Sequence, residues 1–229
     1  MSVITARHIG FAGIEEGSLG NKTWADPGAS RAEKRDAKRR AVLMAGARLF
    51  NDQGYEQTSL EDIAKALSIT KRTIYYYVQS KEEILFGCQQ LGLEFLGETL
   101  ERCYDKRLPV LDRIRLLISR YCAWVCTDLG ACAPLVREVS LSSDRRRELR
   151  AGRARLDHLL RDMIREGMET GEIRECDPRL MASAIFGALN WIPYWNRSDA
   201  PSAPDQIAEA YVMMITSGLV PGADCAQGH

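Results

Sequence analysis

The sequence has few histidines and none of the short motifs that mark the common enzyme families. Its 229 residues include three histidines, His8, His158 and His229. No glycine-rich phosphate loop, HExxH pattern, GxSxG pattern or paired Cys/His motif occurs along the chain. Acid–base catalysis would therefore need carboxylates that no motif assigns. The sequence predicts no catalytic residue, no metal site and no cofactor, and these absences argue against an enzyme, which is kept as an alternative.

Long apolar runs are also missing. No stretch approaches the roughly 18 apolar residues that cross a bilayer, and the first residues lack the basic start and apolar run of a signal peptide. The seven cysteines form no CxxC pair, and an odd number does not fit a disulfide framework. Buried thiols are the favoured interpretation, and a metal site at Cys122, Cys126 and Cys132 is the alternative. We therefore expect a soluble protein of the reducing cytoplasm with no membrane partner.

The alternating apolar pattern of a β-strand is absent as well. From residue 36 onward the apolar positions recur with a helical period, and glycine, proline and capping residues separate the helices. The sequence predicts an all-α protein with a three-helix N-terminal head and a larger C-terminal helical body. The expected ranges are a flexible extension at 1–33, the head at 34–82, the body at 83–220 and a tail at 221–229. Helices of the body are expected near 80–104, 109–127, 131–142, 144–170, 178–195 and 204–219.

Charge is balanced over the chain but not along it. The formal net charge is zero, yet the segment from Arg31 to Lys81 holds eleven Lys and Arg against six Asp and Glu. A basic N-terminal third in a neutral protein indicates a polyanionic partner for that region.

The stretch KRTIYYYV, residues 71–78, places three consecutive tyrosines on one short helix. At 100° per residue, Ile74 and Val78 share the buried edge. Tyr75 and Tyr77 flank that edge, where a tyrosine lays its ring along the core and turns its hydroxyl outward. The remaining exposed positions are Lys71, Arg72, Thr73 and Tyr76. This surface offers hydrogen-bond donors and positive charge to an anionic groove.

A second short helix precedes the tyrosines, and it begins with Ser59 and Asp62 at the spacing of a capping box. Two short helices joined by a tight turn form a helix-turn-helix, whose second helix enters the major groove of DNA. We expect Arg72 or Lys71 to pair with a guanine and the flanking phenols to reach phosphates. Lys81 begins the next helix, where a cation is unfavourable and a bound phosphate would reverse the effect. An exposed lysine among solvent charges is the alternative.

Residues 41–85 closely resemble the DNA-binding head of the TetR/AcrR transcriptional regulators. The resemblance rests on Leu49-Phe50, Gly54-Tyr55, Thr58-Ser59, Asp62-Ile63-Ala64, Thr73-Ile74-Tyr75 and Ser80-Lys81-Glu82. It implies a regulator, by family default a repressor, that binds a palindromic operator in double-stranded DNA as a homodimer and responds to a small molecule. It implies DNA contacts at Thr58, Lys71, Arg72, Thr73, Tyr75, Tyr77 and Lys81, to which the helical wheel adds Tyr76. Ser68 and Val78 depart from the family, which usually has glycine and commonly has phenylalanine there.

The body resembles the family in outline, and the resemblance implies a ligand-binding and dimerisation domain. In the family the last two helices form the dimer interface. The interface residues expected here are Ile185, Ala188, Leu189, Trp191, Ile192, Trp195, Tyr211 and Met214. An ordinary core within one chain is the alternative for these positions.

The resemblance implies that the middle helices enclose a pocket for a small, hydrophobic effector. The stretch ALNWIPYW resembles the corresponding stretch of family members that respond to lipid or acyl-CoA metabolites. The lining residues expected are Phe95, Leu96, Leu100, Tyr104, Leu117, Tyr121, Trp124, Leu159 and Met163. Packing in the core is the alternative for each of them. Two further alternatives concern function: the protein acts as an activator, or its head binds another protein.

Overall fold

The computed structural model describes residues 30–136, 140–196 and 202–221. In those ranges the chain is helical and contains no strand. The helices are α1 (Arg31–Gln53), α2 (Leu60–Ala66), α3 (Lys71–Tyr75), α4 (Lys81–Cys103), α5 (Val110–Val125), α6 (Asp128–Leu135), α7 (Ser143–Glu169), α8 (Pro178–Trp195) and α9 (Pro204–Leu219). Most of the predicted extension, residues 1–29, and most of the predicted tail, residues 222–229, lie outside the described ranges.

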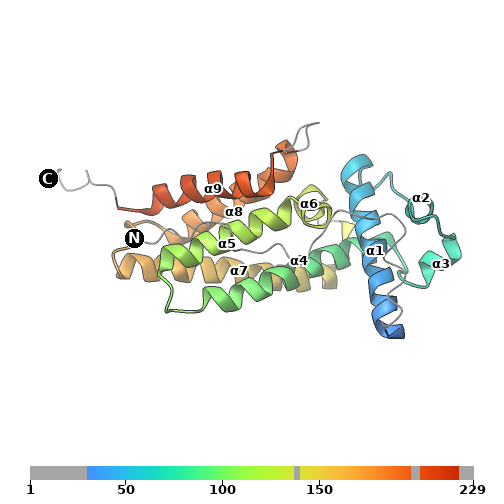
Figure 1. Ribbon diagram of the computed structural model, residues 1–229, viewed down its shortest axis with the longest axis horizontal. Helices are drawn as coiled ribbons and strands as arrows, with labels where there is room; N and C mark the ends of the chain where they lie inside the picture. The colour runs from blue at the N-terminus through green and yellow to red at the C-terminus, as the bar shows by residue number, and fades with distance from the viewer. Residues whose placement is uncertain (1–29, 137–139, 197–201, 222–229) are drawn as a thin grey trace.

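The molecule has a head and an elongated body (Figure 1). Helices α1 to α3 gather at one end, and α4 runs from the head along the body. Helix α5 packs against α4 and α9, and α7 packs against α8. Helix α6 contacts both α1 and α4, so it joins head and body. The predicted 131–142 helix is wrong in its bounds, because α6 ends at Leu135 and Ser142 instead caps α7.

Side-chain caps set the starts of the head helices. Ser59 accepts a hydrogen bond from the Asp62 N–H at 3.1 Å, and the Asp62 carboxylate accepts one from the Ser59 N–H at 2.9 Å. This is the predicted capping box. At α4 the prediction is half right: Ser80 accepts from the Glu83 N–H, but the Glu83 carboxylate accepts from the Gln79 N–H at 2.8 Å.

The head packs around the buried edge of α3. Ile74 and Val78 are fully buried, as the wheel predicts. Helix α3 itself is shorter than expected and ends at Tyr75, but the Val78 N–H still donates to the Ile74 carbonyl at 3.0 Å. The helical turn therefore continues far enough to carry Val78 into the core.

The turn between α2 and α3 contains a strained residue. Ser68 has a φ of 55°, in the left-handed region where a Cβ crowds the backbone and costs roughly 1–2 kcal/mol. We expect Ser68→Gly to raise the free energy of unfolding by about 1 kcal/mol, because glycine adopts this conformation without the clash. Urea denaturation measures the change. Ser68→Ala is the control: it keeps the Cβ, and an equal gain from alanine would contradict the strain argument.

A buried ion pair joins two helices of the body. The Arg113 side chain on α5 is only 3% exposed, and its Nη2 lies 2.6 Å from the Glu166 Oε1 on α7. Its Nη1 donates to the Cys103 carbonyl at the end of α4 at 3.3 Å. Arg113 therefore ties three helices together at the end of the body far from the head.

Candidate DNA-binding surface and ligand cavity

The outer side of α3 carries the predicted donors. Lys71 and Arg72 are exposed, Tyr76 is 67% exposed and Tyr75 is 43% exposed. Thr70 caps the helix and also bonds the Thr73 hydroxyl at 2.8 Å. Lys71 and Arg72 are therefore exposed on the first turn of a capped helix, as expected for a helix that enters the major groove.

The three tyrosines have three different surroundings. Tyr77 is half-buried and packs against the core. The Tyr76 ring meets the Tyr77 ring edge-on at 5.0 Å between centroids, and the Arg35 guanidinium of α1 lies 5.9 Å from the Tyr76 centroid. The N-terminal part of α1, which carries the basic cluster, therefore reaches the same surface as α3.

The structure corrects the assignment of Thr58. This residue is 1% exposed, and its hydroxyl donates to the Gly54 carbonyl at 2.8 Å. It also accepts from the Gln53 side-chain amide at 3.1 Å. The hydroxyl therefore donates and accepts within the head, where it stabilises the α1–α2 turn. Because the side chain is buried, it is not exposed for a contact with DNA.

The structure also changes the argument for Lys81. Its Nζ donates to the Tyr55 carbonyl at 2.7 Å and to the Glu56 carbonyl at 3.3 Å, and lies 4.6 Å from the Tyr55 ring centroid. These contacts offset the unfavourable position at a helix N-terminus. The position of Lys81 therefore has an explanation within the head, besides the bound phosphate that the sequence suggests. An ammonium has three donors, so a phosphate contact stays a proposal.

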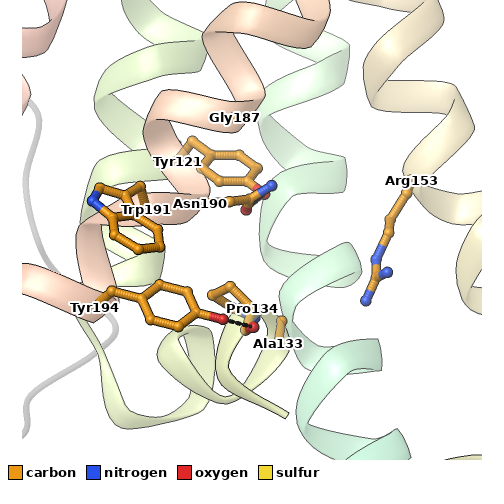
Figure 2. A pocket seen from close by; sticks show the side chains of 8 residues that line it. All are labelled: Tyr121, Ala133, Pro134, Arg153, Gly187, Asn190, Trp191 and Tyr194. Atoms are coloured by element: carbon orange, nitrogen blue, oxygen red, sulfur yellow. Dashed lines mark hydrogen bonds between the residues drawn. The ribbon is translucent and has the colours of Figure 1, made fainter. Parts of the chain in front are cut away.

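A cavity of about 390 Å³ lies in the body between α5, α6, α7 and α8. Figure 2 shows Tyr121 and Asn190 on one side and Arg153 extending toward the space from α7. A smaller cavity of about 40 Å³ adjoins it toward α4 and shares four lining residues. We call them the outer and inner cavities. The outer cavity falls in the range of about 300–1,000 Å³ that is typical of small-molecule sites.

Three of the nine predicted pocket residues line these cavities, namely Leu96, Tyr121 and Trp124. The prediction of Tyr104 as a pocket residue is wrong, because Tyr104 lies on the surface at the end of α4 and is 62% exposed. The other predicted residues line neither cavity. Phe95 stacks on Trp124, Leu100 packs against the core, and Leu117, Leu159 and Met163 are buried core residues.

The sequence reasoning missed the polar lining residues. Arg153 lies on α7, whose many arginines suggest a solvated surface, and Asn190 lies inside the apolar ALNW stretch. The one sequence signal for these lining residues was Asn190, a polar amide in the otherwise apolar helix α8. Arg153 and Asn190 lie on different sides of the outer cavity, and the packing of α7 against α8 brings both to it (Figure 2).

Helices α8 and α9 leave an apolar face uncovered. Trp191, Trp195 and Met214 are 59%, 43% and 56% exposed, while Ala188 and Tyr211 are half-buried. Three predicted interface residues, Ile185, Leu189 and Ile192, are corrected, because they are at most 3% exposed within the single chain. Two exposed apolar residues of these helices that the prediction missed are Leu180 and Met213.

Other expectations concern membranes, metals and thiols. In the described part of the chain, no helix is both long and apolar enough to span a bilayer. No group of three or more His, Cys, Asp or Glu side chains suited to a metal ion occurs among the same residues. Cys88, Cys103, Cys122 and Cys132 are buried thiols, and burial raises the pKa of Cys103 to about 11 and that of Cys122 to about 12.

Two family models match the two parts of the molecule. Residues 42–88 match the model described as bacterial regulatory proteins, tetR family. Residues 107–219 match the tetracyclin repressor-like C-terminal domain. The first match covers most of the head, and the second covers most of the body.

Individual proteins are similar over most of the chain. The HTH-type transcriptional regulator HbdR of Aromatoleum sp. (strain CIB) is 25% identical over 183 residues, which are 79% of this chain and 80% of that protein. The TetR family regulator PfmR of Thermus thermophilus is 31% identical, with a TM-score of 0.68 over 79% of this chain and 99% of PfmR. AibR, solved with isovaleryl coenzyme A and operator DNA, is 28% identical, with a TM-score of 0.68 over 77% of this chain and 97% of AibR.

Proposed function

Because the chain belongs to the TetR family of bacterial regulatory proteins, we propose that it represses transcription from a palindromic operator that it binds as a homodimer. The protein is a DNA-binding transcriptional regulator. A small, largely apolar effector in the body releases it from DNA. The regulator works in the cytoplasm, where its DNA target lies, and it needs no catalytic group for this role.

The observation that carries the proposal is the exposed row of donors on α3. Lys71, Arg72 and Tyr76 are exposed, and Arg72 and Tyr76 lie opposite the buried Ile74. The first residues of such a helix meet base edges in the major groove, and neighbouring donors hold phosphates. The DNA contacts we propose are Lys71, Arg72, Thr73, Tyr75, Tyr76, Tyr77 and the remaining donor of Lys81. The Arg35 contact with Tyr76 extends this surface onto α1.

A second copy of the chain covers the apolar face of α8 and α9 in this proposal. One head reads one half-site, so a palindromic site needs two heads related by a twofold axis. Large apolar patches on monomers mark interaction sites, and Trp191 and Met214 lie on such a patch. The dimer places two α3 helices about 34–36 Å apart, in successive major grooves.

The effector acts by binding one spacing of the heads better than the other, because equal affinity for both would shift nothing. Helix α4 is the element that links the two parts. Its first residue, Lys81, bonds the α1–α2 turn, and Gln89 on the same helix lines the inner cavity. AibR was solved with both an acyl-coenzyme A and operator DNA, which supports an acyl-CoA-like compound as one effector class.

The salt dependence of DNA binding tests this function. DNA selected by the protein from a random pool serves as the probe in gel shifts at rising salt. Each phosphate contact adds about −0.9 to the slope of log affinity against log salt, so a dimer with several contacts per head gives a slope steeper than about −4. Sedimentation of the complex should give two chains per duplex.

Other outcomes favour the alternatives. Failure to retain any DNA would support a head that binds protein. A shallow slope with one chain per duplex would contradict the dimeric operator complex. Transcription in vitro from the selected site distinguishes repressor from activator.

A further inference from the structure

The first turns of α1 lie outside both family matches and place no side chain in the core. Residues 31–41 precede the 42–88 match, and the buried residues of α1 begin at Val42. We call residues 31–41 the leading segment. Packing of an apolar face supplies most of the stability of a helix in a protein. The core of the head therefore does not explain the residues of the leading segment.

A side-chain cap defines where the leading segment begins. The Ser30 Oγ accepts a hydrogen bond from the Glu33 N–H at 3.2 Å, and the Glu33 carboxylate accepts one from the Ser30 N–H at 2.7 Å. This capping box starts the helix at a definite residue. Near the other end of the segment, Arg39 Nη2 lies 3.5 Å from Glu83 Oε1 on α4. The leading segment is therefore a capped helix that contacts the rest of the head.

One face of the leading segment is basic. The segment holds six Lys and Arg against two Asp and Glu. Arg31, Lys34 and Arg35 stand at i, i+3 and i+4, so they share one face of the helix. At 3.6 residues per turn, Glu33 and Asp36 point about 150° away from that face. Within the described residues none of the three cations is in an ion pair, so the acidic residues leave the positive charge of this face uncompensated.

Arg35 places the basic face beside the DNA-binding surface of α3. Its guanidinium lies 5.9 Å from the centroid of the Tyr76 ring, and that ring is 67% exposed. Helices α1 and α3 lie at the same end of the molecule (Figure 1). Because Tyr76 is one of the DNA contacts proposed above, the basic face is continuous with the surface that meets the operator.

The DNA backbone has the charge and the repeat that this face requires. The leading segment is about 16 Å long at 1.5 Å per residue, and each DNA strand carries one charge per 3.4 Å of helix axis. More than one phosphate is therefore within reach of the segment. An arginine side chain matches a phosphate through two parallel N–H donors, and a lysine binds it as a point charge.

We propose that Arg31, Lys34 and Arg35 bind phosphates of the operator backbone beside the groove that α3 enters. This inference rests on the proposed operator binding, and it adds a second contact region in a part of α1 that the family match does not include. Phosphate contacts carry no direct sequence information. The leading segment therefore supplies affinity for any DNA sequence, whereas α3 supplies the specificity.

A variant that removes the three charges tests the inference. Arg31→Gln, Lys34→Gln and Arg35→Gln are combined in one chain, because glutamine has nearly the same helix propensity as arginine and lysine. Six lost phosphate contacts per dimer, at about 0.9 each, flatten the slope of log affinity against log salt by about 5. Gel shifts on the selected operator and on unrelated DNA measure the slope and the affinity. We expect both DNAs to lose at least about tenfold in affinity near 0.1 M salt, and their affinity ratio to change less than about threefold.

A matched variant removes the same number of charges from the body. Arg155→Gln, Arg165→Gln and Arg174→Gln replace three exposed residues. Salt screens charges over about 10 Å at 0.1 M, so this variant should leave the slope within about 1 of the wild type. Neither set of side chains belongs to the core. Both variants should therefore unfold at the same urea concentration as the wild type.

Ethylation interference locates the contacts on the DNA. Some phosphates should block the wild type when they are ethylated but have no effect on the variant of the leading segment. These phosphates should form two sets related by the symmetry of the operator.

Three results would overturn the inference. These are a slope that flattens by less than about 2 beyond the body variant, a loss of affinity on the operator alone, or the same interfering phosphates for both proteins. In each case a wild type that still binds DNA with a steep slope keeps the proposed function. A wild type that retains no DNA contradicts the proposed function itself.

Discussion

Arg72→Ala lowers the affinity for the operator by about 1–3 kcal/mol per half-site, and the loss counts twice because each dimer presents two copies of α3. The side chain is exposed on the first turn of α3, where a helix-turn-helix meets base edges. A bidentate pair between arginine and guanine is worth this amount of discrimination against the wrong base. Gel shifts on the selected operator measure the loss.

Competition with unrelated DNA distinguishes base reading from phosphate contact. If Arg72 reads a base, affinity for unrelated DNA changes little and specificity falls. An equal loss on operator and unrelated DNA would make Arg72 a phosphate contact. Arg48→Ala is the control, because Arg48 is an exposed α1 residue that lies 3.9 Å from Asp52 and belongs to none of the proposed DNA contacts.

Glu166→Ala lowers the free energy of unfolding by about 3 kcal/mol at pH 7. The substitution leaves the Arg113 guanidinium buried without its carboxylate, with the Cys103 carbonyl as a remaining acceptor. Removing one partner of a buried pair costs about 3–5 kcal/mol, and the lower end applies because the Glu166 side chain is 28% exposed. Urea denaturation measures the loss. Glu169→Ala, an exposed residue at the end of the same helix, should change stability by less than about 0.5 kcal/mol.

The pH dependence of that loss has a definite sign. The hydrogen bond from Arg113 lowers the pKa of Glu166 from its ordinary value of 4.5. A lowered pKa in the folded state stabilises the protein above the unfolded value, and this stabilisation disappears as pH falls through the folded value. The difference between wild type and Glu166→Ala should therefore be full near pH 7 and shrink below pH 4.5. A difference that stays constant down to pH 3 would contradict the ion-pair explanation.

The local structure of the head was predictable from sequence because short-range rules decide it. Ser59 with Asp62 encodes a cap that forms within three residues, and the spacing of Ile74 and Val78 encodes a buried edge. Helical periodicity likewise predicts an all-α body. These features depend on residues within one or two turns of each other, where geometry allows few alternatives.

The folded head decides what its polar side chains contact. Thr58 is buried, and the Gly54 carbonyl four residues before it accepts its hydrogen bond. The Lys81 ammonium donates to the Tyr55 carbonyl, which lies 26 positions away along the chain. An apolar stripe on α8 predicts a buried face, but it does not tell whether the same chain or a second subunit buries that face. The sequence therefore assigned Ile185 and Leu189 to the dimer interface, whereas the same chain buries them.

Sequence alone is enough to establish that this chain is helical, that its N-terminal third is basic, and that Arg72 lies opposite Ile74 on its helix. Each property depends on composition or on neighbours a few residues away. Which side chains meet at the cavity depends instead on the packing of distant helices. Gln89 and Arg153 are 64 positions apart, and no periodicity links them. Packing of α4 against α7 brings the Arg153 guanidinium to the Gln89 side-chain amide, and both residues line the inner cavity.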